Sequence, residues 1–186
     1  MRTALLFSIL ALAGAGTLRA QSATFYLVDI GHGNAAFSIS PSGEILLMDC
    51  GGSPGTPARI YNFMQQNGLK KIDYLVVSHF ENDHMGSAPE LSKKVPIINW
   101  VDHGESVTYG KTDEWWYARR GPWSRPGMAK ADDARMDTFK AARATGNHII
   151  VKAGDSRPCW RLRGWTCGRP RRSWAAARRA TTRKTT

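Results

Sequence analysis

The sequence predicts an α/β fold, in which helices pack against a sheet of largely buried strands. Short runs that are β-branched or that alternate between apolar and polar residues recur along the chain and are separated by turn sequences. A helical pattern over residues 56–69 stands between two of these runs, and a strand–helix–strand order is typical of layered α/β packing. The chain has 186 residues, which is enough for one domain with a buried core.

Three strands are predicted before the first helix. Residues 24–30 alternate and carry Phe, Tyr and Val, and Gly31-His32-Gly33 predicts a tight turn after them. Residues 35–40 and 44–49 form two further strands, because Pro41-Ser42-Gly43 between them is a good turn sequence.

The helix predicted over residues 56–69 places Ile60, Phe63 and Met64 on one face, with Thr56 able to cap its start and Gly68 marking its end. A helix is also expected over 128–145, where Met136, Phe139 and Ala142 form the buried stripe. The remaining expected elements are strands over 72–77, 97–101 and 147–151 and a short helix over 87–94.

An aromatic segment over residues 109–123 contains Tyr109, Trp115, Trp116, Tyr117 and Trp123, with Arg119 and Arg120 among them. The segment is interpreted either as a lid whose rings stack on a substrate while the arginines hold an anionic group, or as a cover for the edge of the core. His148 is expected to be a packing or surface residue.

The first 20 residues predict a secretory signal peptide. Arg2 provides a positive start, residues 4–15 are apolar but too short to span a bilayer comfortably, and Leu18-Arg19-Ala20 ends in a small residue before a cut. An uncleaved anchor is the alternative. We expect a secreted or periplasmic protein with no membrane span after cleavage, whose domain comprises residues 21–156.

The tail over residues 157–186 differs in composition from the rest of the chain. Ten of the 26 Lys and Arg residues lie there without any acidic residue, so the other 16 basic residues nearly balance the 15 acidic ones. The net charge of +11 therefore arises almost entirely from the tail. Its Trp and Cys residues are unusual for disorder. We interpret the tail as a segment read out of frame from near Asp155, or alternatively as a disordered basic arm.

Potential metal ligands cluster after the strand over 72–77, at His79, Glu81, Asp83 and His84. Imidazole nitrogen and carboxylate oxygen suit Zn²⁺, and also Mn²⁺ or Fe²⁺. In an extended loop, residues two apart point to the same side, so the first three would converge while His84 faces another way. One or two metals could be held, which would supply a hydroxide for hydrolysis. The alternative is a polar loop with two surface histidines.

These residues also support a resemblance to a known family. His-x-Glu-x-Asp-His over 79–84 resembles the His-x-[His/Asp]-x-Asp-His signature of the metallo-β-lactamase fold. The segments over 28–35 and 41–51 are similar to motifs of the DNA-uptake competence (ComEC-like) subgroup, with the matching order and spacing covering residues 24–103. The resemblance implies a metallo-β-lactamase-like αββα sandwich, of which this chain carries the first ββ-α half. Glu81 departs from the pattern, because the subgroup usually has Asp there and the wider family has His.

The resemblance also implies roles for individual residues. His79 and Glu81 would hold one metal, and Asp83 and His84 the second, with Asp83 also acting in catalysis by orienting the nucleophilic water. Asp49 would order the metal loop from beneath without binding metal. His32, where the subgroup usually has Gln, is expected to be a loop residue that lines the site rather than a ligand. His103 follows the strand over 97–101 and is interpreted, from that position, either as a site residue that contacts a metal or substrate or as a turn histidine. The remaining ligands belong to the second half of the family's domain and are not found in this sequence.

The function predicted on this basis is an exported metal-dependent hydrolase of phosphodiester or other ester or amide bonds. Its substrate would be a small molecule or a nucleic-acid-like ester, and no stable protein partner is expected. An incomplete ligand set predicts weak or no activity for this truncated copy. The alternative is a non-catalytic protein that binds a polyanion or nucleic acid through the aromatic segment and the basic tail.

Overall fold

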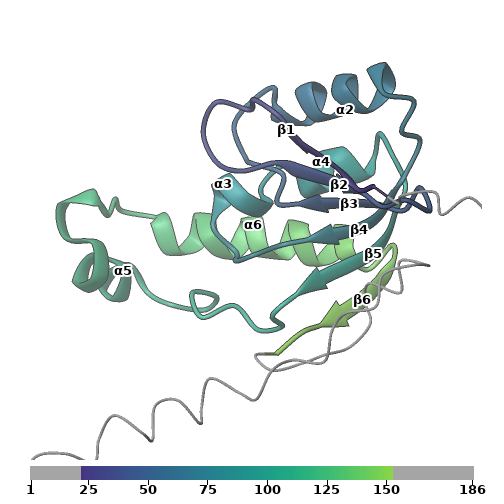
Figure 1. Ribbon diagram of the computed structural model, residues 1–186. Helices are drawn as coiled ribbons and strands as arrows, with labels where there is room; N and C mark the ends of the chain where they lie inside the picture. Colours follow the sequence, from purple (N-terminus) through teal and green to yellow (C-terminus); the bar gives the residue numbers. More distant parts are fainter. Residues whose placement is uncertain (1–21, 153–186) are drawn as a thin grey trace, which may run out of the picture.

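The computed structural model describes residues 22–152 of the chain (Figure 1). The predicted signal peptide and the tail over 157–186 lie outside the described residues. The described part forms a six-stranded sheet in which neighbouring strands follow chain order. Its strands are β1 (Thr24–Leu27), β2 (Ala36–Ile39), β3 (Ile45–Met48), β4 (Ile72–Val76), β5 (Ile97–Asp102) and β6 (Asn147–Ile150).

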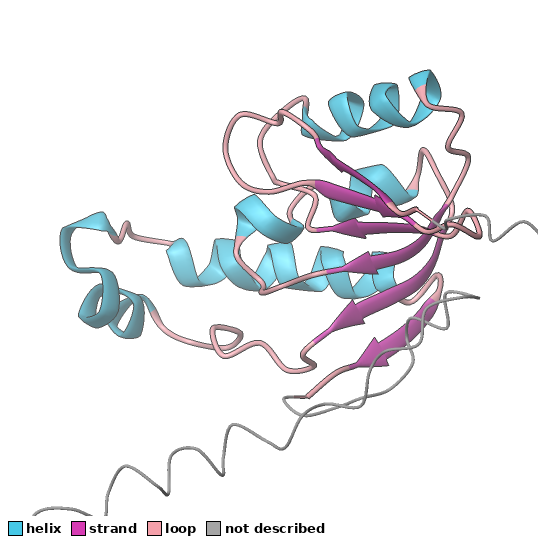
Figure 2. Cartoon of the chain, viewed as in Figure 1, coloured by secondary structure: helices cyan, strands magenta, loops and turns pink. Residues whose placement is uncertain are grey.

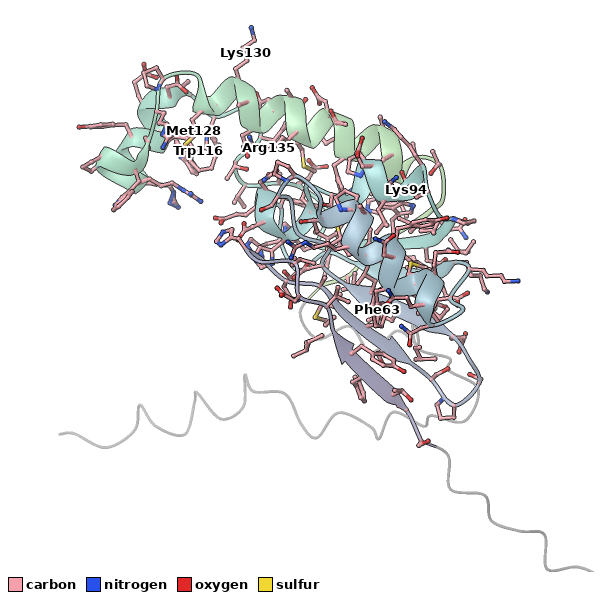
Figure 3. All side chains as sticks on the ribbon, turned by 90° about the horizontal axis from the view of Figure 1, so that it is seen from above. Phe63, Lys94, Trp116, Met128, Lys130 and Arg135 are labelled. Carbon is pink, nitrogen blue, oxygen red and sulfur yellow. The ribbon has the colours of Figure 1, made fainter. Side chains whose placement is uncertain are left out.

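The sheet is mixed. Strands β1, β2 and β3 form an antiparallel meander, whereas β3, β4, β5 and β6 run parallel to one another. The parallel strands are linked through helices α2 (Thr56–Gln66), α4 (Ala88–Ser92) and α6 (Met128–Arg143). Right-handed crossovers between strands that are added in one direction place all their helices on the same face. Figures 2 and 3 show this arrangement, so the α/β prediction is confirmed.

The core lies between this helical layer and the sheet. Phe37, Leu47, Leu75 and Trp100 are in register across four strands, and each is at most 1% exposed. The helices contribute residues that are at most 2% exposed, namely Ile60, Met64, Met136 and Phe139. Burial of large apolar side chains from every layer fixes the strand ends relative to one another.

The predicted start of α2 is wrong in one detail. Gly55 is the N-cap residue, with a positive φ of 88°, and Thr56 is the first residue of the helix, so its side chain does not cap it. A left-handed backbone at this position favours glycine over a side-chain cap. The predicted apolar face is confirmed, because Ile60 and Met64 are fully buried and Phe63 packs against the core.

The aromatic segment contains a helix that the sequence reasoning did not predict. Helix α5 (Asp113–Arg120) begins after Thr112, whose Oγ1 accepts a hydrogen bond from Trp115 N, and continues into the short helix η1 (Gly121–Trp123). The helix has acidic residues in its first turn and Arg119 and Arg120 in its last turn. These charges interact favourably with the helix dipole and stabilise the helix. Figure 1 shows α5 beyond the amino-terminal end of α6.

The helices α5 and α6 are joined by a carboxylate. Asp113 accepts hydrogen bonds from Gly127 N at 2.6 Å and Ala129 N at 2.9 Å, which satisfies free backbone donors at the start of α6. These two backbone N–H groups hold the pKa of Asp113 below its usual value. The contact therefore attaches the start of α5 to the start of α6.

Among residues 22–152, none of the helices combines the length and apolar character that crossing a membrane requires.

Candidate functional site

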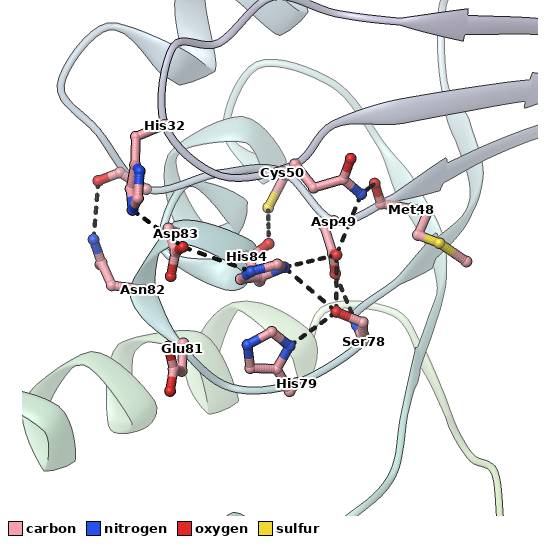
Figure 4. Close-up of polar contacts among 12 residues, drawn as sticks. His32, Met48, Asp49, Cys50, Ser78, His79, Glu81, Asn82, Asp83 and His84 are labelled. Carbon is pink, nitrogen blue, oxygen red and sulfur yellow. Dashed lines mark hydrogen bonds and ion pairs between the residues drawn. The ribbon is translucent and has the colours of Figure 1, made fainter. Parts of the chain in front are cut away.

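The loops that follow four strands meet at one edge of the sheet. Strands β3, β4 and β5 are parallel, so their carboxyl ends lie together, and the two antiparallel pairings bring the end of β1 to the same edge. Such an edge is where α/β sheets commonly place their ligands. The chemistry-bearing residues predicted from the sequence lie in these loops, and Figure 4 shows most of them.

Asp49, at the end of β3, is the centre of the hydrogen-bond network. Its side chain is buried; Oδ1 accepts from Ser78 N at 2.8 Å, and Oδ2 accepts from Ser78 Oγ at 2.8 Å. His84 Nδ1 lies 2.9 Å from the same Oδ2. Asp49 thus contacts the loop after β4 near its start, at Ser78, and at its last histidine, His84. Its role in ordering a metal loop stays a prediction.

Two pairs of predicted ligands, which share His84, lie close together near Asp49. The rings of His79 and His84 have centroids 3.9 Å apart, and Ser78 Oγ lies 3.0 Å from His79 Nδ1. Asp83 Oδ2 lies 3.6 Å from His84 Nε2. Two imidazoles and a carboxylate therefore share one small region of the loop.

The prediction of an extended loop is wrong for its second half. Residues Asn82–Met85 form the short helix α3, and Glu81, the residue before it, has an extended backbone. The reason is Met85, which is 1% exposed and reaches the core only if the chain turns back on itself. Within a helix the rule that residues two apart share a side does not hold, so Asp83 faces His84 instead of lining up with His79 and Glu81.

Glu81 is turned toward the aromatic segment. Its Oε1 lies 2.6 Å from Arg120 Nη2 at the end of α5, and both side chains are partly exposed. The structure therefore gives the Glu81 carboxylate a cationic partner from a distant part of the chain. Its role as a metal ligand stays a prediction.

The predicted site-lining residues His32 and His103 differ in their surroundings. His32 Nε2 lies 3.2 Å from Asp83 Oδ2, although the His32 side chain is 81% exposed. The ring of His103 lies against that of Phe80 in a tilted arrangement, with centroids 4.5 Å apart. His32 is thus in contact with a predicted ligand, whereas His103 contacts Phe80, the residue between His79 and Glu81.

The sequence patterns did not identify Asn34, which connects the loop between β1 and β2 to Asp49. Asn34 Nδ2 lies 3.3 Å from Met48 O and 3.4 Å from Asp49 Oδ2. Its backbone N donates to Asp83 O at 3.4 Å. The available signal was its place directly after the Gly31-His32-Gly33 turn at a strand end, but polar residues are common in such turns.

The loops approach one another backbone to backbone at two glycines. A Cβ atom at Gly33 would collide with the carbonyl oxygen of Asp83, and one at Gly52 would collide with the carbonyl oxygen of Asn82. Glycine is needed at such positions because any side chain would push the segments apart. Gly33 lies in the loop between β1 and β2, and Gly52 lies in the loop between β3 and α2. The two glycines therefore allow these loops to lie directly against α3.

The side chains near Asp49 provide only part of what a metal ion needs. Residues 22–152 contain no group of three or more His, Cys, Asp or Glu side chains positioned to hold one. Glu81 faces Arg120, and His84 Nδ1 faces Asp49. His84 lies close to His79 and to Asp83, and imidazole and carboxylate groups are of the chemistry that Zn²⁺, Mn²⁺ and Fe²⁺ accept. Their types fit such a metal and supply part of a ligand set.

Cys50 lies beside these residues but does not share their chemistry. Its side chain is fully buried, and burial, followed by the negative charge of Asp49, raises the pKa of the thiol far above its ordinary value. Because the pKa is raised, the thiol stays protonated at neutral pH, and a protonated thiol is neither a good nucleophile nor a metal ligand.

We therefore expect Cys50 to resist alkylation in the folded protein. Treatment with iodoacetamide at pH 8 should leave the Cys50 peptide unmodified, whereas the same treatment in 8 M urea should modify it, as read by peptide mass spectrometry. Modification of native Cys50 at the rate of an unfolded thiol would contradict the burial of this residue.

Part of the chain is similar to curated proteins described as UPF0173 metal-dependent hydrolases. The chain is 34% identical over 80 residues to a UPF0173 metal-dependent hydrolase of Cupriavidus necator, a match of 40% of this chain and 27% of that protein. It is 36% identical over 72 residues to a UPF0173 metal-dependent hydrolase of Cupriavidus metallidurans, covering 36% and 24%. The corresponding protein of Cupriavidus taiwanensis is 32% identical over 80 residues, covering 40% and 27%.

The aligned stretch thus spans about a quarter of the length of these curated relatives. A family model, described as the metallo-beta-lactamase superfamily, matches residues 29–154, which is more than half of the chain. That range contains β2 to β6, Asp49 and the whole loop after β4. The chain therefore belongs to the metallo-beta-lactamase superfamily.

Proposed function

We propose that this chain carries part of the active site of a metal-dependent hydrolase, with His79, Asp83 and His84 as ligands. The observation that supports this most directly is the pair formed by Asp49 and His84. A buried carboxylate lies 2.9 Å from His84 Nδ1, and His84 Nε2 lies 3.6 Å from a second carboxylate, that of Asp83. Histidines that bind metals commonly donate their other ring N–H to a carboxylate in this way.

The residues of this chain would act by orientation. With the proton on Nδ1 donated to Asp49, His84 Nε2, which lies 3.6 Å from Asp83 Oδ2, keeps its lone pair free to bind a metal, and Ser78 holds the neighbouring His79 through its Nδ1. Asp83 then offers a carboxylate that can orient a water molecule beside both imidazoles. A bound metal would lower the pKa of its water toward ~7 and polarise a scissile ester.

The substrate class belongs to the same proposal. The motifs over 28–35 and 41–51 favour the DNA-uptake type, and with it a phosphodiester, over other esters and amides. The leader-like composition of residues 1–20 supports action outside the cytoplasm.

We further propose that the segment over 157–186 replaces the second half of the domain. The family match ends at residue 154, before the composition changes. In addition, the sheet exposes Phe25, Leu27 and Met48, which a second layer would bury. Resequencing the coding DNA across Val151 to Thr186 tests this proposal, since another reading frame should continue with strands and further ligands. The absence of such a frame would count against it.

The central test is metal dependence. The purified chain, stripped with a chelator, should regain hydrolysis of bis(p-nitrophenyl) phosphate on addition of Zn²⁺ or Mn²⁺. The rate is expected to be low, because His79, Asp83 and His84 are only part of a ligand set. His79→Ala should reduce it by roughly tenfold through weaker metal binding.

The matched control is Lys70→Ala, an exposed residue at the amino end of β4, opposite the site. This variant should retain the metal-restored rate. A His79→Ala protein that is as active as the unmodified chain, or activity unaffected by the chelator, would refute the proposal.

A second function is favoured by the surface of α5 and η1. Trp123 is 84% exposed and Tyr117 is 63% exposed, close in sequence to Arg119, which is a composition that suits binding of a polyanion. Binding of single-stranded DNA that weakens steeply with salt, together with no metal-dependent hydrolysis, would favour this alternative.

A further inference from the structure

The face of the sheet that points away from helices α2 and α6 carries a continuous apolar row. Phe37 contacts Phe63 of α2, with ring centroids 5.0 Å apart, and thus lies on the helical face. Trp100 contacts Phe139 of α6 in the same way, at 5.7 Å. Successive side chains of a strand point to opposite faces, so the residues next to these point the other way. One such row is in register across the six strands and consists of Leu27, Ala36, Met48, Val76, Val101 and Ile149.

The second row on this face is uncharged as well. Its members, again in register, are Phe25, Ser38, Leu46, Tyr74, Asn99 and Asn147. Neither row contains Asp, Glu, Lys or Arg. A sheet face that meets water usually carries polar and charged side chains, whereas strands that are apolar on both faces are typical of a sheet with both faces covered. The composition of the two rows therefore favours a second layer on this face.

Part of this face, on the antiparallel strands, is open to solvent. Leu27 is 84% exposed, Phe25 is 69% exposed and Met48 is 40% exposed. We call these three residues the open-face patch. Large apolar side chains that stand together in water gain free energy when a partner covers them, and such groups commonly mark interaction surfaces.

The distribution of charge along the chain favours a second copy as the partner. The segment over 157–186 contains ten Lys and Arg residues and no acidic residue, so it is poorly suited to lie against an uncharged apolar face. A second copy presents the same uncharged face. Two copies could therefore pack face to face without burying a charge, which suits a two-fold symmetric dimer, where both subunits use the same surface.

We infer that two copies of this chain associate through this face, so that each buries the open-face patch of the other. The inference rests on the proposal that the segment over 157–186 replaces the second half of the domain, which would otherwise cover the patch. Six strands about 4.8 Å apart and about 13 Å long present a face on the order of 350 Å² in projection. Because stable interfaces bury about 800 Å² on each partner, the dimer is weak and depends on concentration.

Sedimentation velocity of the full chain without added metal tests the association. The runs use about 0.3 M NaCl, which screens the repulsion between two chains of net charge +11. Between about 5 and 500 µM, the unmodified chain should shift from the mass of one chain toward that of two. Leu27→Asp and Met48→Asp each place a charge in the interface and should weaken dimerisation by at least about tenfold.

The matched control is Val107→Asp, which replaces an apolar residue that is 74% exposed and lies between β5 and α5, outside both rows. This variant should dimerise like the unmodified chain, and equal urea midpoints of the dilute proteins verify that each is folded. A chain that stays monomeric over the whole range, as it would if its own terminal segments covered the patch, would overturn the inference. Equal weakening by Val107→Asp and Leu27→Asp would do the same. Both outcomes leave metal-dependent hydrolysis untouched, because no metal is present in these runs.

Discussion

Replacing Asp49 by Ala should lower the free energy of unfolding by about 3 kcal/mol. The change removes a buried carboxylate, so the groups of Ser78 and His84 that contact it would be left without a hydrogen-bond partner. Ser78 N, Ser78 Oγ and His84 Nδ1 all lie within 2.9 Å of its carboxylate. His84 would also lose the contact that orients its ring, so the affinity for Zn²⁺ should fall by roughly 10- to 100-fold. Urea denaturation and calorimetric titration measure the two effects.

The matched control is Asp29→Ala. Asp29 also follows a strand at this edge of the sheet, but it is exposed and accepts its bond from nearby Gly31 N at 3.0 Å. We expect its loss to cost less than about 1 kcal/mol. Equal urea midpoints for Asp49→Ala and the unmodified chain would show that the network around Asp49 does not hold the loop.

Gly33→Ala should be about 2 kcal/mol more destabilising than Gly31→Ala, because insertion of a side chain into a closely packed contact adds to the backbone cost. Both glycines have positive φ, 99° at Gly33 and 81° at Gly31, so replacement strains the backbone at either position. Only at Gly33 would the new Cβ collide with Asp83, whereas at Gly31 nothing lies within 4 Å.

Urea denaturation of the two variants in parallel measures the difference. Because the displaced partner is the backbone of Asp83, Gly33→Ala should also weaken Zn²⁺ binding, whereas Gly31→Ala should not. Similar losses of stability in both variants would indicate that the loop between β1 and β2 is not closely packed against α3.

The fold class and the elements that build the sheet could be predicted from the sequence alone, and the sequence also indicated where a site would lie. The alternation and β-branching of the runs over 35–40, 44–49 and 72–77 reflect burial in a sheet, which depends mainly on local composition. Parallel strands also bring their carboxyl ends together, so Asp49 and His84 could be expected near each other from their positions after two strands. Membership of the metallo-beta-lactamase superfamily agrees with the motif over 79–84, whereas the DNA-uptake subgroup and export stay predictions.

How the individual side chains face one another follows from the tertiary structure and could not be predicted from the sequence. Burial of Met85 turns the second half of the loop into α3, which moves Asp83 toward His84. The pairing of Glu81 with Arg120 depends on where α6 places α5, and the contact of Gly33 with Asp83 depends on the packing of two loops. These contacts join residues far apart in the sequence, and their geometry follows from packing of the whole core, which no local pattern encodes.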